Sequence, residues 1–129
     1  MLDTNICIYI IKNKPKKVIM ELKRHKPSEI CVSAITYAKL TYGVEKSMAV
    51  EKNRLALALL FSNIEVLDFD TKAAIHYGKI RAYLEKQGTP IGSLDMMIAA
   101  HAMSLGYTVV TNNIKEFERV PDLKLENWA

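Results

Sequence analysis

The chain has 129 residues, of which half are hydrophobic and a quarter are charged, and its formal net charge is +4. This length and balance predict one globular domain over residues 1–129 and exclude a largely disordered chain. No apolar run approaches about 18 residues, and the first residues lack the basic and apolar stretches of a secretory signal, so we expect a cytoplasmic protein without a membrane span.

The two cysteines, Cys7 and Cys31, lie in apolar surroundings and lack the spacing of a metal-binding pair. Together with three scattered histidines, they exclude a structural zinc site. We expect both to be buried free thiols.

In the N-terminal half, short apolar runs alternate with longer helical patterns. A first strand ends at Leu2, and the β-branched run Glu29–Ser33 predicts a second strand. Pro15 suits the first turn of a helix, because its missing N–H has no partner at that position in any case. The helices expected in this half cover Ile6–Lys12, Lys16–His25, Ile35–Ser47 and Val50–Asn63.

The last of these helices contains the run Leu55–Phe61, which is apolar nearly all round. A helix with one buried face does not need such a sequence, so we expect this segment to be covered on more than one side. Cover from a second copy of the chain predicts a homodimer.

The C-terminal half continues the alternation of strands and helices. Asp70 predicts a helix N-cap, and Gly88 and Gly106 predict two helix ends. The elements expected here are the strands Ile64–Leu67, Tyr107–Val110 and Leu123–Asn127 and the helices Thr71–Gln87, Ser93–Leu105 and Ile114–Glu118. This order predicts an α/β fold with a mostly parallel sheet, whose functional site lies beyond the C-terminal ends of the strands.

One stretch of the chain carries most of its positive charge. Residues 12–26 hold seven Lys or Arg residues and one acid, Glu21, while the rest of the chain is balanced. Such a patch indicates a polyanion such as nucleic acid, although a solvated helix face explains it equally well. The candidate RNA-binding residues are Lys12, Lys14, Lys16, Lys17, Lys23, Arg24 and Lys26.

Polar residues gather at three places near strand ends. Asp3-Thr4-Asn5 follows the first strand, Thr111-Asn112-Asn113 follows the strand Tyr107–Val110, and Asp95 lies in the first turn of a helix. Because the C-terminal ends of parallel strands meet at one edge, these side chains are expected to converge. Clustered carboxylates at such an edge bind a hard cation such as Mg²⁺ or Mn²⁺.

Each of these residues also has a purely structural interpretation. Asp3 or Thr4 can cap the first helix, and Asp95 can answer the positive end of its helix dipole, with Ser93 as the N-cap. Asn113 with Glu116 three residues later fits a capping box. His101, six residues after Asp95, points to another side of its helix, and we expect a core or interface histidine.

Four segments resemble the PIN-domain toxins of the VapC family, in the same order and over the length of the chain. They are Leu-Asp-Thr-Asn at residues 2–5, Ser-Ala-Ile-Thr-Tyr-Ala-x-Leu-x-Tyr-Gly-Val-Glu-Lys-Ser at 33–47, Gly-Ser-Leu-Asp-Met-Met-Ile-Ala-Ala-His-Ala at 92–102 and Thr-Asn-Asn-x-x-Glu-Phe-x-Arg-Val at 111–120. The final Leu-Glu-Asn-Trp is similar to the family's last strand.

The resemblance implies a three-layer α/β/α fold and a function. VapC toxins are ribonucleases in which three or four acidic residues bind Mg²⁺ or Mn²⁺, and a VapB antitoxin holds them inactive. Members most similar to this chain cleave initiator tRNA in the anticodon loop, giving a 5′-phosphate and a 3′-hydroxyl. Operator DNA is expected to bind only through the antitoxin, within a larger toxin–antitoxin assembly.

Carried over by position, Asp3 matches the family's first acid and Asp95 the third, and these two are the expected metal ligands. Asn113 stands at the fourth position, where an amide oxygen can still bind a cation, and Glu116 is the nearest carboxylate. The residues expected to orient them are Thr4, Asn5, Thr111, Asn112 and Glu116.

The second family acid, a glutamate, is replaced here by Lys39. An ammonium cannot bind Mg²⁺, but it can pair with Asp3 or Asp95 in place of a cation. We therefore expect a weak or inactive ribonuclease, unless Lys39 is a surface residue outside the site. The alternatives are a catalytically silent subunit that binds antitoxin and, with it, operator DNA, and a phosphoacceptor or phosphatase fold.

Overall fold

The computed structural model describes all residues from Met1 to Ala129. Seven α-helices and four short strands make up the regular structure, with one 3₁₀ helix, η1 (Pro27–Glu29). The helices are α1 (Thr4–Lys12), α2 (Lys16–Lys23), α3 (Ala34–Glu45), α4 (Val50–Leu60), α5 (Thr71–Gln87), α6 (Ser93–Leu105) and α7 (Ile114–Phe117). The strands are β1 (Cys31–Ser33), β2 (Glu65–Leu67), β3 (Val109–Val110) and β4 (Leu125–Glu126).

The N-terminal segment Met1–Asp3 joins two pairs of parallel strands into one sheet. Strand β1 pairs with β2, and β3 pairs with β4, both in parallel. The N–H of Leu2 donates to the carbonyl of Cys31 at 2.9 Å, and Leu2 forms a parallel bridge with Val110. The order across the sheet is therefore β2, β1, Met1–Asp3, β3 and β4.

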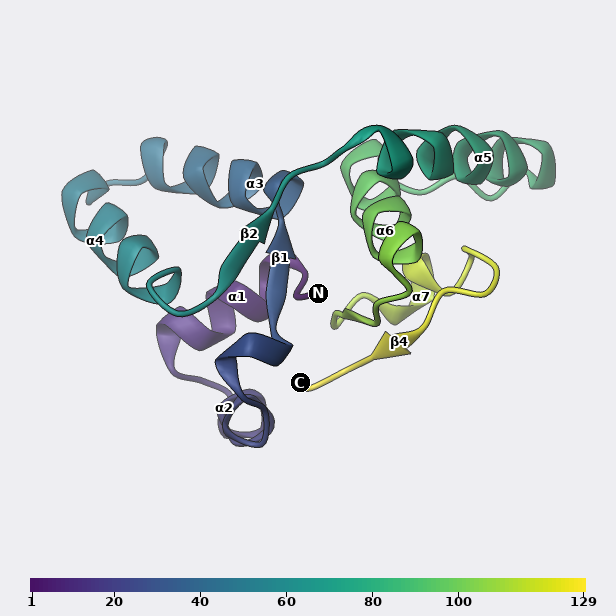
Figure 1. Cartoon of the computed structure of the whole chain (residues 1–129). Coiled ribbons are helices and arrows are strands. Elements are labelled where there is room, and N and C mark those ends of the chain that lie inside the picture. The colour runs from purple at the N-terminus through teal and green to yellow at the C-terminus, as the bar shows by residue number, and fades with distance from the viewer.

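Successive residues of the central strands point to opposite faces of the sheet and fill two separate cores. Met1, Cys31 and Val109 pack with the α5–α6–α7 half of the chain. The following residues, among them Leu2 and Val32, pack with α1, α2, α3 and α4 on the other face. The two groups of helices lie on either side of the strands (Figure 1). This arrangement confirms the expected α/β/α layers.

The C-terminal tail returns to helix α2 and closes one end of the second core. Trp128 is buried, and its ring stacks on that of His25 with centroids 5.2 Å apart and an interplanar angle of 8°. The indole N–H donates to Glu126. The tail thereby ties the last strand to the region that follows α2.

Most predicted helix ends are confirmed. The carboxylate of Asp70 accepts from the N–H of Ala73 at 3.0 Å, as expected of an N-cap. Gly88 and Gly106 end α5 and α6 with φ values of 70° and 69°, in the left-handed region where a side chain is strained. The N-cap of α6 is Gly92 instead of Ser93, so that expectation is wrong.

Other local predictions need correction. Glu29 belongs to η1, where Pro27 at the first position and the Glu29 carboxylate bonded to the Lys26 N–H favour a helical turn over a strand. Pro15 is the N-cap of α2 and not part of its first turn. The strands near Tyr107 and Leu123 are shorter than expected, because only two residues of each form ladder hydrogen bonds.

Helix α4 is covered on one side only. Leu57 is buried, while Leu55 and Leu59 are 64% and 67% exposed. No other segment of this chain therefore covers the outer side of Leu55–Phe61, which the sequence predicts to be buried on more than one side. None of the helices combines the length and the apolar character that crossing a membrane requires.

Candidate functional site

Asp3 ends the central strand segment and begins α1, and its carboxylate is held from both sides. Oδ1 accepts from the N–H of Thr4 at 2.7 Å, and Oδ2 accepts from the hydroxyl of Thr111 at 2.8 Å. Both Asp3 and Thr111 are buried. Asp3 therefore is the N-cap of α1, as its structural interpretation predicts, and at the same time a fixed carboxylate at the C-terminal edge of the sheet.

Thr111 connects Asp3 to the loop after β3. Its hydroxyl oxygen also accepts from the N–H of Asn113 at 2.9 Å. Asn113 makes no side-chain cap bond at the start of α7, so the capping box with Glu116 is not formed. The amide of Asn113 is thus left for a role other than capping.

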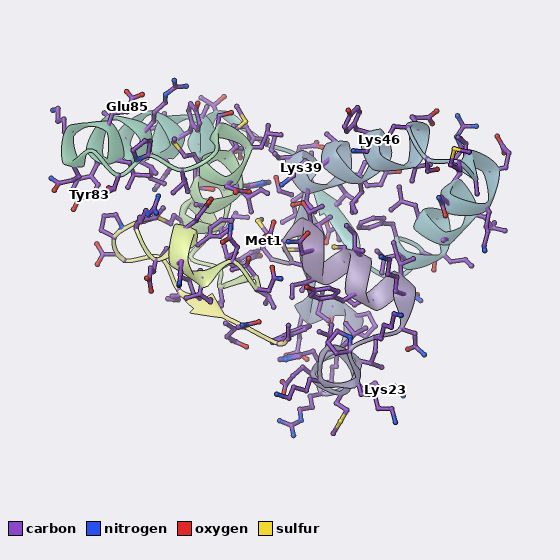
Figure 2. The ribbon with its side chains drawn as sticks, turned by 180° about the vertical axis from the view of Figure 1, so that it is seen from behind. Met1, Lys23, Lys39, Lys46, Tyr83 and Glu85 are labelled. Atoms are coloured by element: carbon purple, nitrogen blue, oxygen red, sulfur yellow. The ribbon has the colours of Figure 1, made fainter.

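Lys39 lies opposite Asp95, as the family register predicts. Its Nζ is 3.5 Å from Oδ1 of Asp95, and the side chains are 30% and 19% exposed. Figure 2 shows Lys39 on α3 where the two halves of the molecule meet. This contact confirms the predicted ion pair with Asp95, and Lys39 is part-buried instead of fully exposed at the surface.

The charges around Asp95 show which carboxylates share its neighbourhood. Burial raises the pKa of Asp95 most, the ammonium of Lys39 opposes this rise, and the negative charges of Asp3 and Glu116 add to it. Glu116 therefore belongs to the same electrostatic environment as the two aspartates.

A chain of amide hydrogen bonds borders this group. Nδ2 of Asn5 donates to Oδ1 of Asn112 at 3.2 Å, and Nδ2 of Asn112 donates to the hydroxyl of Tyr9 at 2.8 Å. Tyr9 was not expected at the site. Its spacing of four residues from Asn5, on one face of α1, is the sequence signal that places it there.

Thr4 holds Asp3 through its backbone N–H and not through its hydroxyl. The Oγ1 atom of Thr4 is buried and has no hydrogen-bond partner. Thr4 lines a groove of about 300 Å³ between α1, α3 and α4, together with Lys12 and Lys39. Two lysines therefore contribute to the lining of this groove, whereas Asp3, Asp95 and Glu116 do not.

The donor set as it stands does not fit a resident Mg²⁺ or Mn²⁺ ion. One oxygen of Asp95 faces the ammonium of Lys39, which repels a cation, while each oxygen of Asp3 accepts one hydrogen bond and keeps a lone pair free. No three His, Cys, Asp or Glu side chains are grouped so that they could hold a metal. Mg²⁺ prefers six oxygen ligands, and Lys39 supplies a positive charge beside Asp95 instead of an oxygen.

The basic stretch lies apart from these acids. All seven of its Lys and Arg side chains are exposed, and Arg24 pairs with Glu21 at 3.1 Å. Lys23 on α2 lies at the far end of the molecule from Lys39 (Figure 2). Of the seven, Lys12 alone lines the groove that contains Lys39. The structure thus does not bring the stretch as a whole to the site.

The cysteines have no part in this chemistry. Both are free and buried, as expected. Burial, with a smaller effect of the Asp3 charge, raises the pKa of Cys7 to about 12, so its thiol stays protonated and unreactive at neutral pH.

Comparison with known proteins decides the family. The model of the PIN domain matches residues 1–123. The chain belongs to the PIN-domain family. This membership excludes the phosphoacceptor or phosphatase alternative.

Relatives place the chain among the VapC proteins of that family. The "tRNA(fMet)-specific endonuclease VapC" of Salmonella typhimurium is 53% identical over 100% of this chain and 97% of its own. "Ribonuclease VapC2" of Rickettsia felis is 46% identical over 99% and 96%.

Solved structures agree with this assignment. The toxin fold in the DNA-bound VapBC of Salmonella typhimurium matches with a TM-score of 0.95 and 51% identity, over 100% of this chain and 97% of that one. VapBC2 of Rickettsia felis, bound to a promoter DNA fragment, matches with a TM-score of 0.91 and 44% identity, over 100% and 98%.

The raised pKa of Asp95 predicts a pH-dependent effect on the stability of this VapC-family chain. Because the pKa of Asp95 is raised in the folded chain, the free energy of unfolding falls as the pH rises through that pKa. The ionised carboxylate therefore destabilises the fold near pH 7, whereas the protonated form at about pH 3 does not. We expect Asp95→Asn to raise the Tm near neutral pH and to lose that advantage in acid.

Thermal unfolding followed by circular dichroism at both pH values checks this expectation. Glu118→Gln is the matched control, because Glu118 is exposed and such a change stays within about 0.5 kcal/mol. Equal Tm values for Asp95→Asn and the parent near pH 7 would contradict the assigned burial of this charge.

Proposed function

We propose that this chain is the toxin ribonuclease of a VapBC-type toxin–antitoxin system and that Lys39 keeps its nuclease weak. The observation that carries the proposal is the contact between Lys39 Nζ and Asp95 Oδ1 at 3.5 Å. It places a positive charge among carboxylates in a chain whose relatives are named as ribonucleases. The cytoplasm, where RNA is accessible and the thiols stay reduced, is the proposed compartment.

The proposed substrate is initiator tRNA. Support comes from the Salmonella relative, which is named as specific for tRNA(fMet) and is 53% identical over the whole chain. The exposed basic stretch around α2 is proposed to hold the RNA backbone at a distance from the cleavage site. A tRNA is long enough to contact both regions, whereas a dinucleotide is not.

The residues of the site have different proposed roles. Thr4 and Thr111 hold Asp3 in place, and the amides of Asn5 and Asn112 form the border next to it. In VapC-family chemistry a divalent cation activates water and stabilises the charge on the phosphate. Asp3 and Asp95 are the proposed ligands for that cation once position 39 carries a carboxylate.

The magnitude of the charge effect supports a large loss of metal binding. Two unit charges about 5 Å apart interact with about 3 kcal/mol at an effective dielectric constant of about 20. Lysine in place of glutamate adds this repulsion and removes a similar attraction. At about 1.4 kcal/mol per tenfold, metal affinity falls by several orders of magnitude.

We expect Lys39→Glu to gain cleavage of tRNA(fMet) by several orders of magnitude at millimolar Mg²⁺. The physical reason is the restored third carboxylate and the removed ammonium. The measurement is a gel assay of cleavage against Mg²⁺ and Mn²⁺ concentration for the parent chain and the variant.

Lys46→Glu is the matched control for that gain. It makes the same change in charge at the C-cap of the same helix, where Lys46 lies over the ring of Tyr42. We expect no gain from it. Equal cleavage by the parent and the Lys39→Glu variant at millimolar Mg²⁺ would show that position 39 lies outside the site.

The second candidate function is a catalytically silent subunit that binds the antitoxin and, through it, operator DNA. The same ion pair favours it, because a site blocked by an ammonium leaves the binding surfaces intact. The Lys39→Glu chain separates the two functions. Cleavage by that chain supports a toxin with a suppressed site, and its failure at any metal concentration supports the silent subunit.

An apolar groove is the proposed seat of a VapB-type antitoxin. It measures about 470 Å³ and lies between α1, α2 and α4, with Ile10, Leu22 and Leu59 among its lining residues. The basic residues of α2 lie beside it, so an acidic and apolar segment is the complementary partner. The two similar solved structures, from Salmonella typhimurium and Rickettsia felis, are DNA-bound VapBC and VapBC2.

We expect Leu59→Asp to weaken antitoxin binding by at least about tenfold, as for a truncated contact at the centre of an interface. Leu55→Asp is the control, because Leu55 has the same type, helix and exposure but does not line the groove. Calorimetric titration with the Salmonella typhimurium VapB measures both. Equal losses in the two variants would move the antitoxin to another surface.

The homodimer expected from the sequence is also part of the proposal. The exposed apolar side chains of α4 and of the α5–α6 half, such as Leu55, Ile75 and Leu94, offer surface for it. Light scattering without any partner is expected to give twice the chain mass of 14.6 kDa. A monomer at micromolar concentration would contradict this expectation.

A further inference from the structure

A buried hydrogen bond links helix α6 to the start of helix α3. Nδ1 of His101 and Oγ of Ser33 are 2.7 Å apart, and both residues are buried. Ser33 is the N-cap of α3, and its oxygen also accepts from the N–H of Ile35 at 3.1 Å. The imidazole is held edge-on by Phe69, with ring centroids 5.5 Å apart. The core histidine predicted from the sequence is thus confirmed, with a specific partner.

This bond and the Lys39–Asp95 contact join the same two helices in one register. Lys39 lies six residues after Ser33, and Asp95 lies six residues before His101. At about 1.5 Å per residue, both steps cover about 9 Å along their helices. The two contacts therefore run in opposite chain direction and lie about one and two-thirds turns apart, on different sides of each helix. No other side-chain hydrogen bond joins them.

Apolar packing also contributes to this register. The buried residues of α6 between the two contacts are Met96, Ile98, Ala99 and Ala100, and Ile35 of α3 packs against the same core. Thr36, also between the contacts on α3, has a buried hydroxyl without a partner. Apolar packing is non-directional, whereas a buried hydrogen bond has a defined geometry and is costly to leave unmade.

We infer that His101 is a positioning residue, which sets the distance between positions 39 and 95 through its hydrogen bond to Ser33. For the chain as written, this bond sets the approach of Lys39 to Asp95. For a chain with glutamate at position 39, it sets the spacing of two proposed metal ligands, and this second part rests on the proposed function.

The protonation state of His101 is consistent with a fixed link. Burial lowers the pKa of His101, and the charges of Asp70 and Asp68 offset this only in part. The ring is therefore neutral near pH 7, with one nitrogen as donor and the other as acceptor.

Two substitutions separate positioning from mere packing. His101→Leu fills the space without a polar atom, and His101→Asn keeps a polar atom as many bonds from Cα as Nδ1 while leaving a cavity. We expect both to lower the stability towards urea. Thr36→Val, an isosteric change between the two contacts, is the control and removes only an unpartnered hydroxyl.

The first readout is Mn²⁺ affinity of the Lys39→Glu chain, measured by calorimetry under conditions where each variant is folded. We expect His101→Leu to lower the affinity by about 10- to 100-fold, the effect of losing a residue that orients ligands. His101→Asn and Thr36→Val are expected to retain the affinity. An equal loss in the Leu and Asn variants, or no loss in either, overturns the inference.

The second readout uses the chain as written and needs neither metal nor activity. A double-mutant cycle of Lys39→Met and Asp95→Asn measures their coupling in urea unfolding, expected at about threefold in the unfolding constant for a part-exposed pair. The coupling should vanish with His101→Leu and return with His101→Asn. If the Lys39→Glu chain binds no Mn²⁺, the proposed function fails, and the double-mutant cycle alone tests the role of His101. Unchanged coupling between positions 39 and 95 in the His101→Leu background overturns that role.

Discussion

The backbone hydrogen bonds of the segment Met1–Asp3 hold the two halves of this molecule together. On one side Leu2 bonds to Cys31, and on the other Asp3 donates to Val110 while Val110 donates to Met1. Without this segment, the β1–β2 and β3–β4 pairs would be two separate two-stranded ribbons. The same segment ends in Asp3, so the element that joins the sheet also delivers the first acid to its edge. Fold and site therefore depend on one short strand.

The edge of the sheet collects negative charge, and this chain neutralises it with its own side chain. The negative charges of Asp3 and Glu116 act on Asp95, and burial makes ionisation of Asp95 costly. A chain with glutamate in place of Lys39 would have to balance a further carboxylate from outside. Here the ammonium of Lys39 provides the balance internally. Lysine at this position thus makes the folded chain less dependent on an added cation, and in the proposed function it stands where a metal-binding carboxylate would be needed.

Sequence reasoning found the features that local patterns encode. The alternation of strands and helices, the caps at Asp70, Gly88 and Gly106, and the convergence of polar residues after strand ends all follow from short-range chemistry. The family motif then identified position 39, and its contact with Asp95 followed from register. These inferences succeed because both the helical period and the direction of parallel strands constrain where a side chain can lie.

The remaining features depend on three-dimensional packing that no local pattern records. The hydrogen bond of His101 to Ser33 joins residues 68 positions apart, and that of Tyr9 to Asn112 joins residues 103 apart. The position of α2 away from the acids follows from how the chain turns after α1. Leu55 and Leu59 are apolar in sequence, but only the assembled chain shows that nothing within it covers them.

The stacked pair Trp128–His25 gives the molecule an optical property. Trp128 is the only tryptophan, so all indole fluorescence arises from one buried site between the C-terminal tail and the end of α2. His25 also lines the apolar groove beside α4. A ligand in that groove therefore lies one ring away from the fluorophore, and its arrival changes the emission of a chain that carries no added label.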